Sequence, residues 1–281
     1  MPTEQHDLES GNAVHHPALD AFAALLQEAP DAGVVTDGDR WLSRRQIDAA
    51  AGDVADRLHA AGLQPGALAA IAVGNGPAFL AALLAVWRRG AVAILIDAAI
   101  TAPERNRVAT TLGAHCTVAA DGFQLDAAAW DIEAITGAAC ERLTDAAVIK
   151  MTSGSSGTPR GIVVSAQALL ADARALASGF GFDANDRFLC TLPLSHSYGL
   201  SVLALPALTM GTALIVPRQQ LPLAAAAAGG ATIFPTVPSY LRALLKPTTP
   251  APWPPLLRQV ITAGEMLPPA VAADFERVYG L

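Results

Sequence analysis

The residues best suited to chemistry lie in one short segment, KMTSGSSGTPRG at 150–161, in a chain otherwise rich in Ala, Leu and Val. The apolar sequences VIKM before it and IVV after it predict that the segment is a loop joining two β-strands. Its glycines let backbone N–H groups crowd together and point at an anion, and its hydroxyls add donors without bulk. Arg160 supplies a positive charge for an oxygen-rich ligand. The segment is therefore predicted to bind phosphate groups.

Three other interpretations of this segment fit less well. Pro159 stands five residues after Gly154, so the G-x-x-x-x-G-K-[ST] spacing of a Walker loop is not met. The sequence has no G-x-S-x-G elbow there, so the serines are poor candidates for hydrolase nucleophiles. A Ser/Gly-rich linker remains as the alternative, although linkers are rarely flanked by two apolar strands.

A second glycine-rich turn, Gly74-Asn75-Gly76, lies between an apolar run at 68–73 and an apolar helix expected from about 78 to 88. It is similar to a dinucleotide-binding fingerprint, but Phe79 stands where the third glycine would be. We therefore interpret it as a tight strand-to-helix turn. Together with the apolar run at 91–96 it predicts a βαβ unit whose strands are buried and parallel.

The elements that must position these residues follow from alternating apolar segments. Ser43 and Gln46 form a capping-box pattern that begins an amphipathic helix, and Gly62 ends it. Further strands are predicted at 116–120, 148–151, 162–164, 188–192, 213–216, 231–234 and 258–262, and further helices at 166–178, 198–209, 236–245 and 269–279. The proline-rich stretch 246–256 is predicted to be a surface loop. This alternation predicts an α/β fold of stacked, mostly parallel β-sheets flanked by helices.

Composition excludes several classes of function. The net charge is −7 and no basic cluster is interleaved with aromatic residues, so we expect no nucleic-acid partner. The N-terminal sequence has no secretory pattern and the three cysteines have no C-x-x-C spacing, which predicts a cytoplasmic location. About thirty residues between Arg187 and Arg218 carry no charge, but prolines, glycines and polar residues divide them, so we expect no membrane span.

TSGSSGTPRG resembles the phosphate-binding signature of the adenylate-forming (AMP-binding) superfamily. This superfamily contains acyl-CoA synthetases, peptide-synthetase adenylation domains and luciferases. Four further segments resemble the same family in the same order: WLSRRQIDAAAGDVADRLHAAGLQPG, VGNGPAFLAALLAVWRRGAVAILID, LPLSHSYG and LRQVITAGEML. The resemblance covers roughly residues 34–281 and implies the incomplete N-terminal domain of an adenylate-forming enzyme. The expected division is a flexible tail at 1–16 and a partial adenylation domain at 17–281.

The resemblance also implies roles for individual residues. The loop would hold the β- and γ-phosphates of ATP, with Thr152 beside Mg²⁺ and Arg160 where lysine is commoner; its members are Thr152, Ser153, Gly154, Ser155, Ser156, Gly157, Thr158, Pro159, Arg160 and Gly161. His196 matches the histidine that orients the acyl group against the α-phosphate, and Tyr198 is expected to bind substrate. Gly264, Glu265 and Met266 match a turn that lines the adenine pocket. A core histidine and a plain strand-to-helix connection are the respective structural alternatives.

The chemistry implied by the resemblance has two halves. A carboxylate attacks the α-phosphorus of ATP to give an acyl-adenylate and pyrophosphate, and a thiol of coenzyme A or of a carrier protein then displaces AMP. The family's later segments do not appear by Leu281, so we expect a front portion that needs a C-terminal half or a partner chain and is inactive alone. A noncatalytic nucleotide-binding module is the alternative. Residues 199–240 contain no acidic residue, which favours a fatty or aryl acid over a peptide-synthetase substrate. The sequence does not indicate the oligomeric state.

Overall fold

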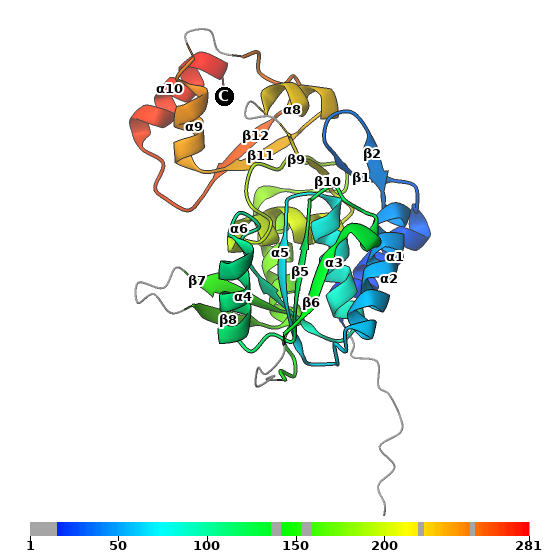
Figure 1. Cartoon of the computed structure of the whole chain (residues 1–281). Coiled ribbons are helices and arrows are strands. Elements are labelled where there is room, and N and C mark those ends of the chain that lie inside the picture. Colours follow the sequence, from blue (N-terminus) through cyan, green and yellow to red (C-terminus); the bar gives the residue numbers. More distant parts are fainter. Residues whose placement is uncertain (1–15, 136–141, 153–158, 219–221, 248–250, 281) are drawn as a thin grey trace, which may run out of the picture.

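The structure is a computed structural model that describes residues 16–135, 142–152, 159–218, 222–247 and 251–280. These residues form two six-stranded β-sheets with helices between and around them (Figure 1). Sheet A has the strand order β12-β11-β9-β10-β1-β2, and sheet B has the order β6-β5-β3-β4-β7-β8. The predicted fold of stacked sheets flanked by helices is therefore confirmed.

Sheet B contains four parallel strands with one antiparallel strand at each edge. Its strands are β3 (Leu68–Val73), β4 (Val92–Leu95), β5 (Cys116–Ala120), β6 (Asp131–Ala134), β7 (Val148–Thr152) and β8 (Arg160–Val164). The central strands β3 and β4 are buried along their whole length, because helices cover both faces. Helix α4 (Ala102–Thr111) follows β4.

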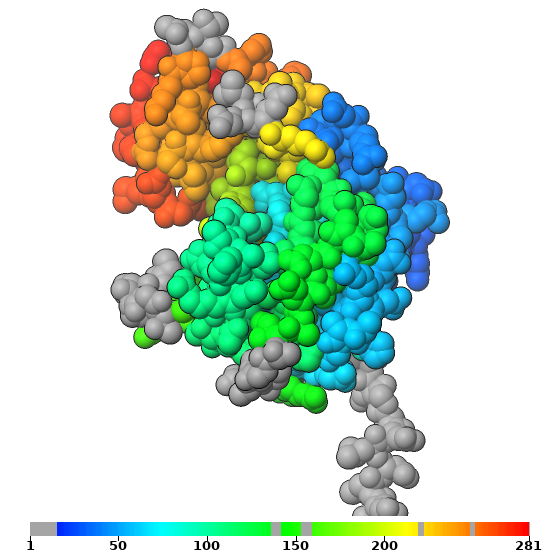
Figure 2. All heavy atoms as spheres, in the orientation of Figure 1, coloured from blue at the N-terminus to red at the C-terminus, as the bar shows by residue number. Residues whose placement is uncertain are grey.

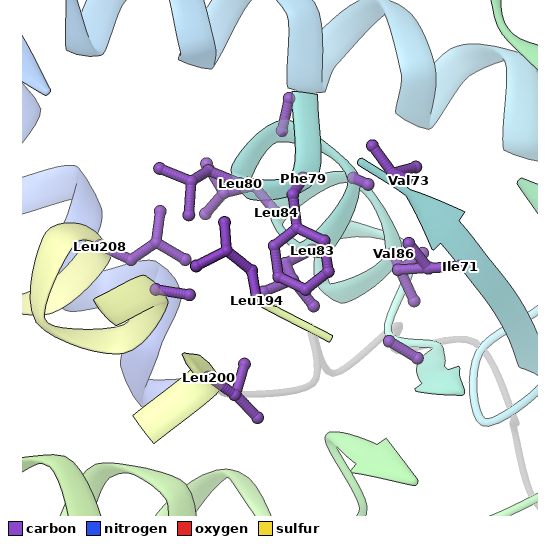
Figure 3. Close-up of a cluster of buried hydrophobic side chains, with 14 of the residues drawn as sticks. Ile71, Val73, Phe79, Leu80, Leu83, Leu84, Val86, Leu194, Leu200 and Leu208 are labelled. Carbon is purple, nitrogen blue, oxygen red and sulfur yellow. The ribbon is translucent and has the colours of Figure 1, made fainter. Parts of the chain in front are cut away.

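Helix α3 (Pro77–Arg88) lies at the centre of the molecule and is buried from Pro77 to Trp87. Figure 3 shows its side chains between Ile71 and Val73 of β3 on one side and Leu194, Leu200 and Leu208 on the other. Helix α2 (Arg44–Ala60) packs outside it and begins with the predicted capping box, in which Ser43 and Gln46 each bond the other's backbone N–H. Burial of this kind explains the nearly uninterrupted apolar sequence of α3.

Sheet A joins segments from both ends of the chain. Its strands are β1 (Gly33–Thr36), β2 (Trp41–Ser43), β9 (Arg187–Leu189), β10 (Ala213–Ile215), β11 (Ile233–Thr236) and β12 (Gln259–Thr262), all parallel except β2. A second apolar cluster covers the β11–β12 end and includes Trp253, Phe275 and Tyr279. Its helices are α8 (Leu223–Gly229), α9 (Pro238–Leu244) and α10 (Pro269–Tyr279).

The segment 188–217 has no charged residue, yet it folds as several short elements. After β9 come α6 (Ser197–Gly199), a π-helical turn (Leu200–Ala204) and α7 (Leu205–Thr209), which lead to β10. Helix α5 (Ala166–Phe180) packs against this segment. None of the helices in the described ranges is long and apolar enough to cross a membrane.

The sequence did not predict α1 (Pro17–Glu28), β1, β2, α4 or β6. The edge strands β2 and β6 are short and have mixed exposure, so their sequences lack a clear apolar pattern. Of the predicted N-terminal tail, only His16 is described; it is buried and stacks on Trp87. Cys116 and Cys190 are buried within the core, and Cys140 lies outside the described residues.

Candidate functional site

The predicted phosphate loop joins two strands, as the flanking apolar residues indicated. Strands β7 and β8 form an antiparallel pair in which Thr152 lies opposite Arg160. The Thr152 hydroxyl donates a hydrogen bond to the backbone carbonyl of Arg160 over 3.3 Å, which fixes the base of the loop. The predicted site residues Ser153, Gly154, Ser155, Ser156, Gly157 and Thr158 lie outside the described residues. Their contribution to phosphate binding stays a prediction.

Arg160 and Gly161 begin strand β8 on the far side of the loop. Arg160 is exposed, and its guanidinium makes no hydrogen bond or ion pair with any other residue in the described ranges. Gly161 has a packing role that its sequence context did not reveal. A Cβ atom at this position would collide with the side chain of Ile149 on β7, so any other residue here requires Ile149 to shift.

Thr152 and His196 meet at a cavity of about 670 Å³ at the carboxyl ends of β4 and β7. Its walls also include Asp97, which follows β4, and Glu104 of α4. In the space-filling view the surface is indented between α4, coloured teal, and the orange and red elements of α9 and α10 (Figure 2). The carboxyl ends of parallel strands are the usual place for ligands in α/β sheets.

His196 immediately precedes helix α6 and presents its ring to solvent, with 59% of the side chain exposed. Its Nε2 atom lies 3.6 Å from Oδ2 of Asp97 across the cavity. An exposed ring does not fit the alternative of a core histidine bonded to backbone. Asp97 and His196 both line the cavity, so the ring is available to a ligand bound there.

Asn75 positions the segment that carries His196, and sequence reasoning missed this role. Its side-chain amide donates to the carbonyl of Leu192 over 2.8 Å and accepts from the N–H of Leu194 over 2.9 Å. The turn Gly74-Asn75-Gly76 thereby connects the end of β3 in sheet B to the segment after β9 in sheet A. Gly76 packs so closely on Gly122 that a Cβ atom would overlap its carbonyl. The position of Asn75 between two glycines was the one signal in the sequence that could have predicted this connection.

Tyr198 lies one residue beyond Ser197 and lines a second, smaller cavity of about 310 Å³. Its hydroxyl donates to the carbonyl of Ile261 on β12 over 2.9 Å. Burial raises the pKa of Tyr198 to about 12, against a weaker opposing effect of the backbone at Thr236. The tyrosine is therefore neutral at physiological pH, and its ring forms a wall of the cavity.

The second cavity adjoins the first, because Ser197 lines both. Most of its surface is apolar, from α5, the π-helical turn and β12. Two charged residues also line it, Lys150 of β7 and Asp172 of α5, and Asp172 accepts a hydrogen bond from the hydroxyl of Ser201. Sequence reasoning missed both charges because α5 and β7 are far in sequence from Tyr198.

Gly264, Glu265 and Met266 form the turn after β12, next to Ala263 of the second cavity. Gly264 has a φ of +90°, which favours glycine. Glu265 points to α9, where one oxygen accepts from the N–H of Ser239 over 3.1 Å and from Arg242 over 3.0 Å. Its carboxylate therefore caps the start of α9. The Met266 side chain is 89% exposed and points away from the core.

The residues of the first cavity fit an ion held jointly with phosphates better than a metal held by protein alone. Within the described part of the chain, no group of three His, Cys, Asp or Glu side chains is arranged to bind a metal. Thr152, Asp97 and Glu104 nevertheless place oxygen atoms around one cavity. Mg²⁺ prefers oxygen ligands and is commonly bound by one or two protein groups together with substrate phosphates and water.

A family model described as AMP-binding enzyme matches residues 22–281. The chain belongs to this AMP-binding enzyme family. Among curated proteins, the AMP-binding chain is 31% identical over 188 residues to 2-succinylbenzoate–CoA ligase of Bacillus licheniformis, covering 62% of this chain and 39% of that protein. It is 31% identical over 221 residues to CymA of Salinispora arenicola, described as a probable non-canonical nonribosomal peptide synthetase, covering 71% of this chain and 3% of that protein.

Solved structures share the fold of the AMP-binding chain. The N-terminal domain of FACL13 from Mycobacterium tuberculosis aligns with a TM-score of 0.78 and 22% identity, covering 94% of this chain and 73% of that one. The o-succinylbenzoate CoA synthetase of Bacillus subtilis, solved with an acyl-adenylate intermediate, aligns with a TM-score of 0.74 and 23% identity, covering 92% and 71%. The AMP-binding chain spans 39% of the length of the Bacillus licheniformis ligase.

Proposed function

We propose that this chain carries the ATP- and acid-binding face of an enzyme that activates carboxylic acids. A carboxylate oxygen forms a bond to the α-phosphorus of ATP while the bond to pyrophosphate breaks, which leaves an acyl-adenylate. The single observation that carries the proposal is the joining of two cavities through Ser197, one lined by Thr152 and His196 and the other by Tyr198. The family to which the chain belongs supports the use of ATP.

The larger cavity suits the phosphates. Thr152 offers a hydroxyl at the start of the loop, and Arg160 offers a guanidinium that no described carboxylate neutralises. Thr152, Asp97 and Glu104 would hold Mg²⁺ together with the phosphates, and the ion would neutralise phosphate charge. Catalysis of this step depends on positioning and charge stabilisation, so donors matter more than nucleophiles. His196 faces Asp97 and lies just after the segment that Asn75 holds, and it would orient the carboxylate that attacks.

The smaller cavity suits the body of the acid. Tyr198 and Ile261 form an apolar wall, and the turn from Gly264 to Met266 continues from the same strand toward the position proposed for adenine. Glu265 would hold this turn against α9. The sequence favoured a fatty or aryl acid, and coenzyme A or a carrier-protein thiol is the proposed acceptor. A C-terminal half or a partner chain would supply the groups for that second step.

Isotope exchange between pyrophosphate and ATP, together with MgATP binding by calorimetry, tests this function. We expect MgATP to bind the chain, and we expect acid-dependent exchange once the proposed C-terminal half or partner chain is supplied. Thr152→Ala and His196→Ala should each lower exchange by about tenfold to a thousandfold, as loss of one stabilising donor does. Thr111→Ala and His59→Ala are matched controls, because Thr111 also donates to a backbone carbonyl and His59 is an exposed helical histidine. MgATP binding with no exchange under any of these conditions would instead indicate a noncatalytic nucleotide-binding module.

A further inference from the structure

The smaller cavity contains two charges of opposite sign that the proposed function does not use. Both line the cavity: Lys150 lies on β7 and is partly buried, and Asp172 lies on α5 and is exposed. No ion pair within 4.0 Å joins them, and the ammonium group of Lys150 has no hydrogen-bonded or ion-paired partner among the residues that the structure describes. An ammonium group in a mostly apolar cavity lowers its free energy by gaining an anionic partner.

Lys150 is placed to meet the carboxylate that reacts. It stands two residues before Thr152 on the same strand, so both side chains leave the same face of sheet B about 7 Å apart. Ser197 lines the cavity of Lys150 and the cavity of Thr152. An acid bound in the smaller cavity with its carboxylate toward Ser197 would therefore lie between Lys150 and the phosphates at Thr152.

Asp172 gives the lining of the same cavity a negative charge. One of its oxygens accepts a hydrogen bond from the hydroxyl of Ser201, which also lines the cavity. The other oxygen keeps its acceptor capacity, which suits an ammonium group. The residues at 199–240 lack an acidic side chain, but the fold brings Asp172 from α5 to the cavity that Tyr198 lines.

We propose that the acid activated by this chain is a small carboxylic acid that carries an amino group, and that Asp172 selects it. The proposal rests on the proposed function and names its substrate class. A zwitterion matches a cavity with one positive and one negative side chain. The volume of about 310 Å³ lies at the lower end for ligand pockets and suits a small acid better than a long acyl chain.

Calorimetry on the chain with matched acids tests the proposal. The probes are leucine against isocaproate, and β-homoleucine against its desamino acid. We expect at least one amino acid to bind about tenfold tighter than its partner, because a hydrogen bond to a charged group contributes about that much at a partly exposed site. In Asp172→Asn the preference should fall to about twofold or less. In Lys150→Met both members of a pair should weaken together, because they share the carboxylate.

Three further variants separate selection from a structural role. Ser201→Ala keeps the charge of Asp172 and should keep the preference, whereas a merely structural hydrogen bond would make Ser201→Ala behave like Asp172→Asn. Asp53→Asn, on the exposed side of α2, is the matched control and should change nothing. Asp172→Ala provides a second variant; Asp172 lies on the exposed side of α5, so both are expected to fold.

The outcomes distinguish this proposal from the proposed function. Equal binding of both members of each pair, or a preference that survives in Asp172→Asn, overturns the selection of an amino group. Binding of MgATP but of none of the acids also overturns it. A preference that depends on Asp172 in a chain that does not bind MgATP supports the cavity assignment and contradicts the ATP-dependent function.

Discussion

Sheet B packs around α3 almost entirely through apolar side chains, whereas polar groups hold the strands of sheet A together where they begin. Nearly every side chain of α3 is excluded from solvent. In sheet A, buried Asp186 accepts hydrogen bonds from Arg258 over 2.9 and 3.0 Å and from the Thr232 hydroxyl over 2.7 Å. These bonds join the starts of β9, β11 and β12, which come from distant parts of the chain.

The difference matters because the candidate site uses both sheets. Thr152 stands on β7 of sheet B, while Ile261 lies on β12 of sheet A and the turn at Gly264 follows that strand. Asn75 and Tyr198 make the connections between them. We therefore expect substitutions in the core of sheet B to act mainly on stability. Substitutions of the residues that connect the two sheets should act mainly on ligand binding.

The largest expected effect is in the apolar core of sheet B. Leu83 of α3 is fully buried, and Leu83→Ala removes apolar surface and leaves a cavity. The free energy of unfolding should fall by about 3 kcal/mol, measured by urea denaturation. Leu83→Met conserves volume and should cost about 1 kcal/mol. Equal losses for the two variants would contradict close packing around α3.

A smaller loss of stability is expected where Asp186 joins the starts of the strands of sheet A. Asp186→Ala removes an acceptor from Arg258, from the Thr232 hydroxyl and from the N–H of Asp183. The expected loss is about 2 kcal/mol, because Asp186 is buried while Arg258 is half exposed and remains hydrated. Asp31→Ala, which breaks an exposed pair with Arg45, should produce no measurable change. Equal losses of stability in the two aspartate variants would show that the buried polar bonds of Asp186 do not stabilise sheet A.

Asn75→Ala tests the connection between the sheets. It should lower the free energy of unfolding by about 1 to 2 kcal/mol, because the Leu192 carbonyl and the Leu194 N–H lose their partner. MgATP and acid binding should weaken more than stability does, since the segment that carries His196 loses its support. Asn185→Ala, in an exposed loop, is the matched control. Unchanged ligand binding in Asn75→Ala would show that this connection between the sheets does not position the site.

The smallest effect at neutral pH is expected for Tyr198→Phe, which removes one hydrogen bond worth about 1 kcal/mol. The substitution should also change how stability depends on pH under alkaline conditions. The folded-state pKa of Tyr198 is raised to about 12 from 10, so its contribution is complete below pH 10 and is lost as pH rises through 12. Stability of the wild type should therefore fall more steeply over this range than that of Tyr198→Phe. Parallel curves would contradict the burial of the hydroxyl.

Much of the fold was predictable because local patterns of apolar residues indicate most of its strands and helices. The predicted strands of sheet B and the capping box at Ser43 are confirmed. The short edge strands β2 and β6 were not predicted, since half-exposed strands of three or four residues carry little periodic signal. The partners of Asn75, Glu265 and Asp172 were also hidden, because each contact joins residues far apart in sequence. The motifs indicated which residues belong to the site, but the packing of two sheets determines how they meet.

Binding of a non-hydrolysable acyl-adenylate analogue, an aminoacyl sulfamate of adenosine, tests most directly whether the two cavities form one site. We expect the analogue to bind at least about a hundredfold tighter than AMP or the free acid, because it fills both cavities across Ser197. Thr152→Ala and Asp172→Asn should each weaken the binding of the analogue. An analogue that binds no more tightly than AMP, and that is insensitive to substitutions in the smaller cavity, would contradict a single site formed by the two cavities.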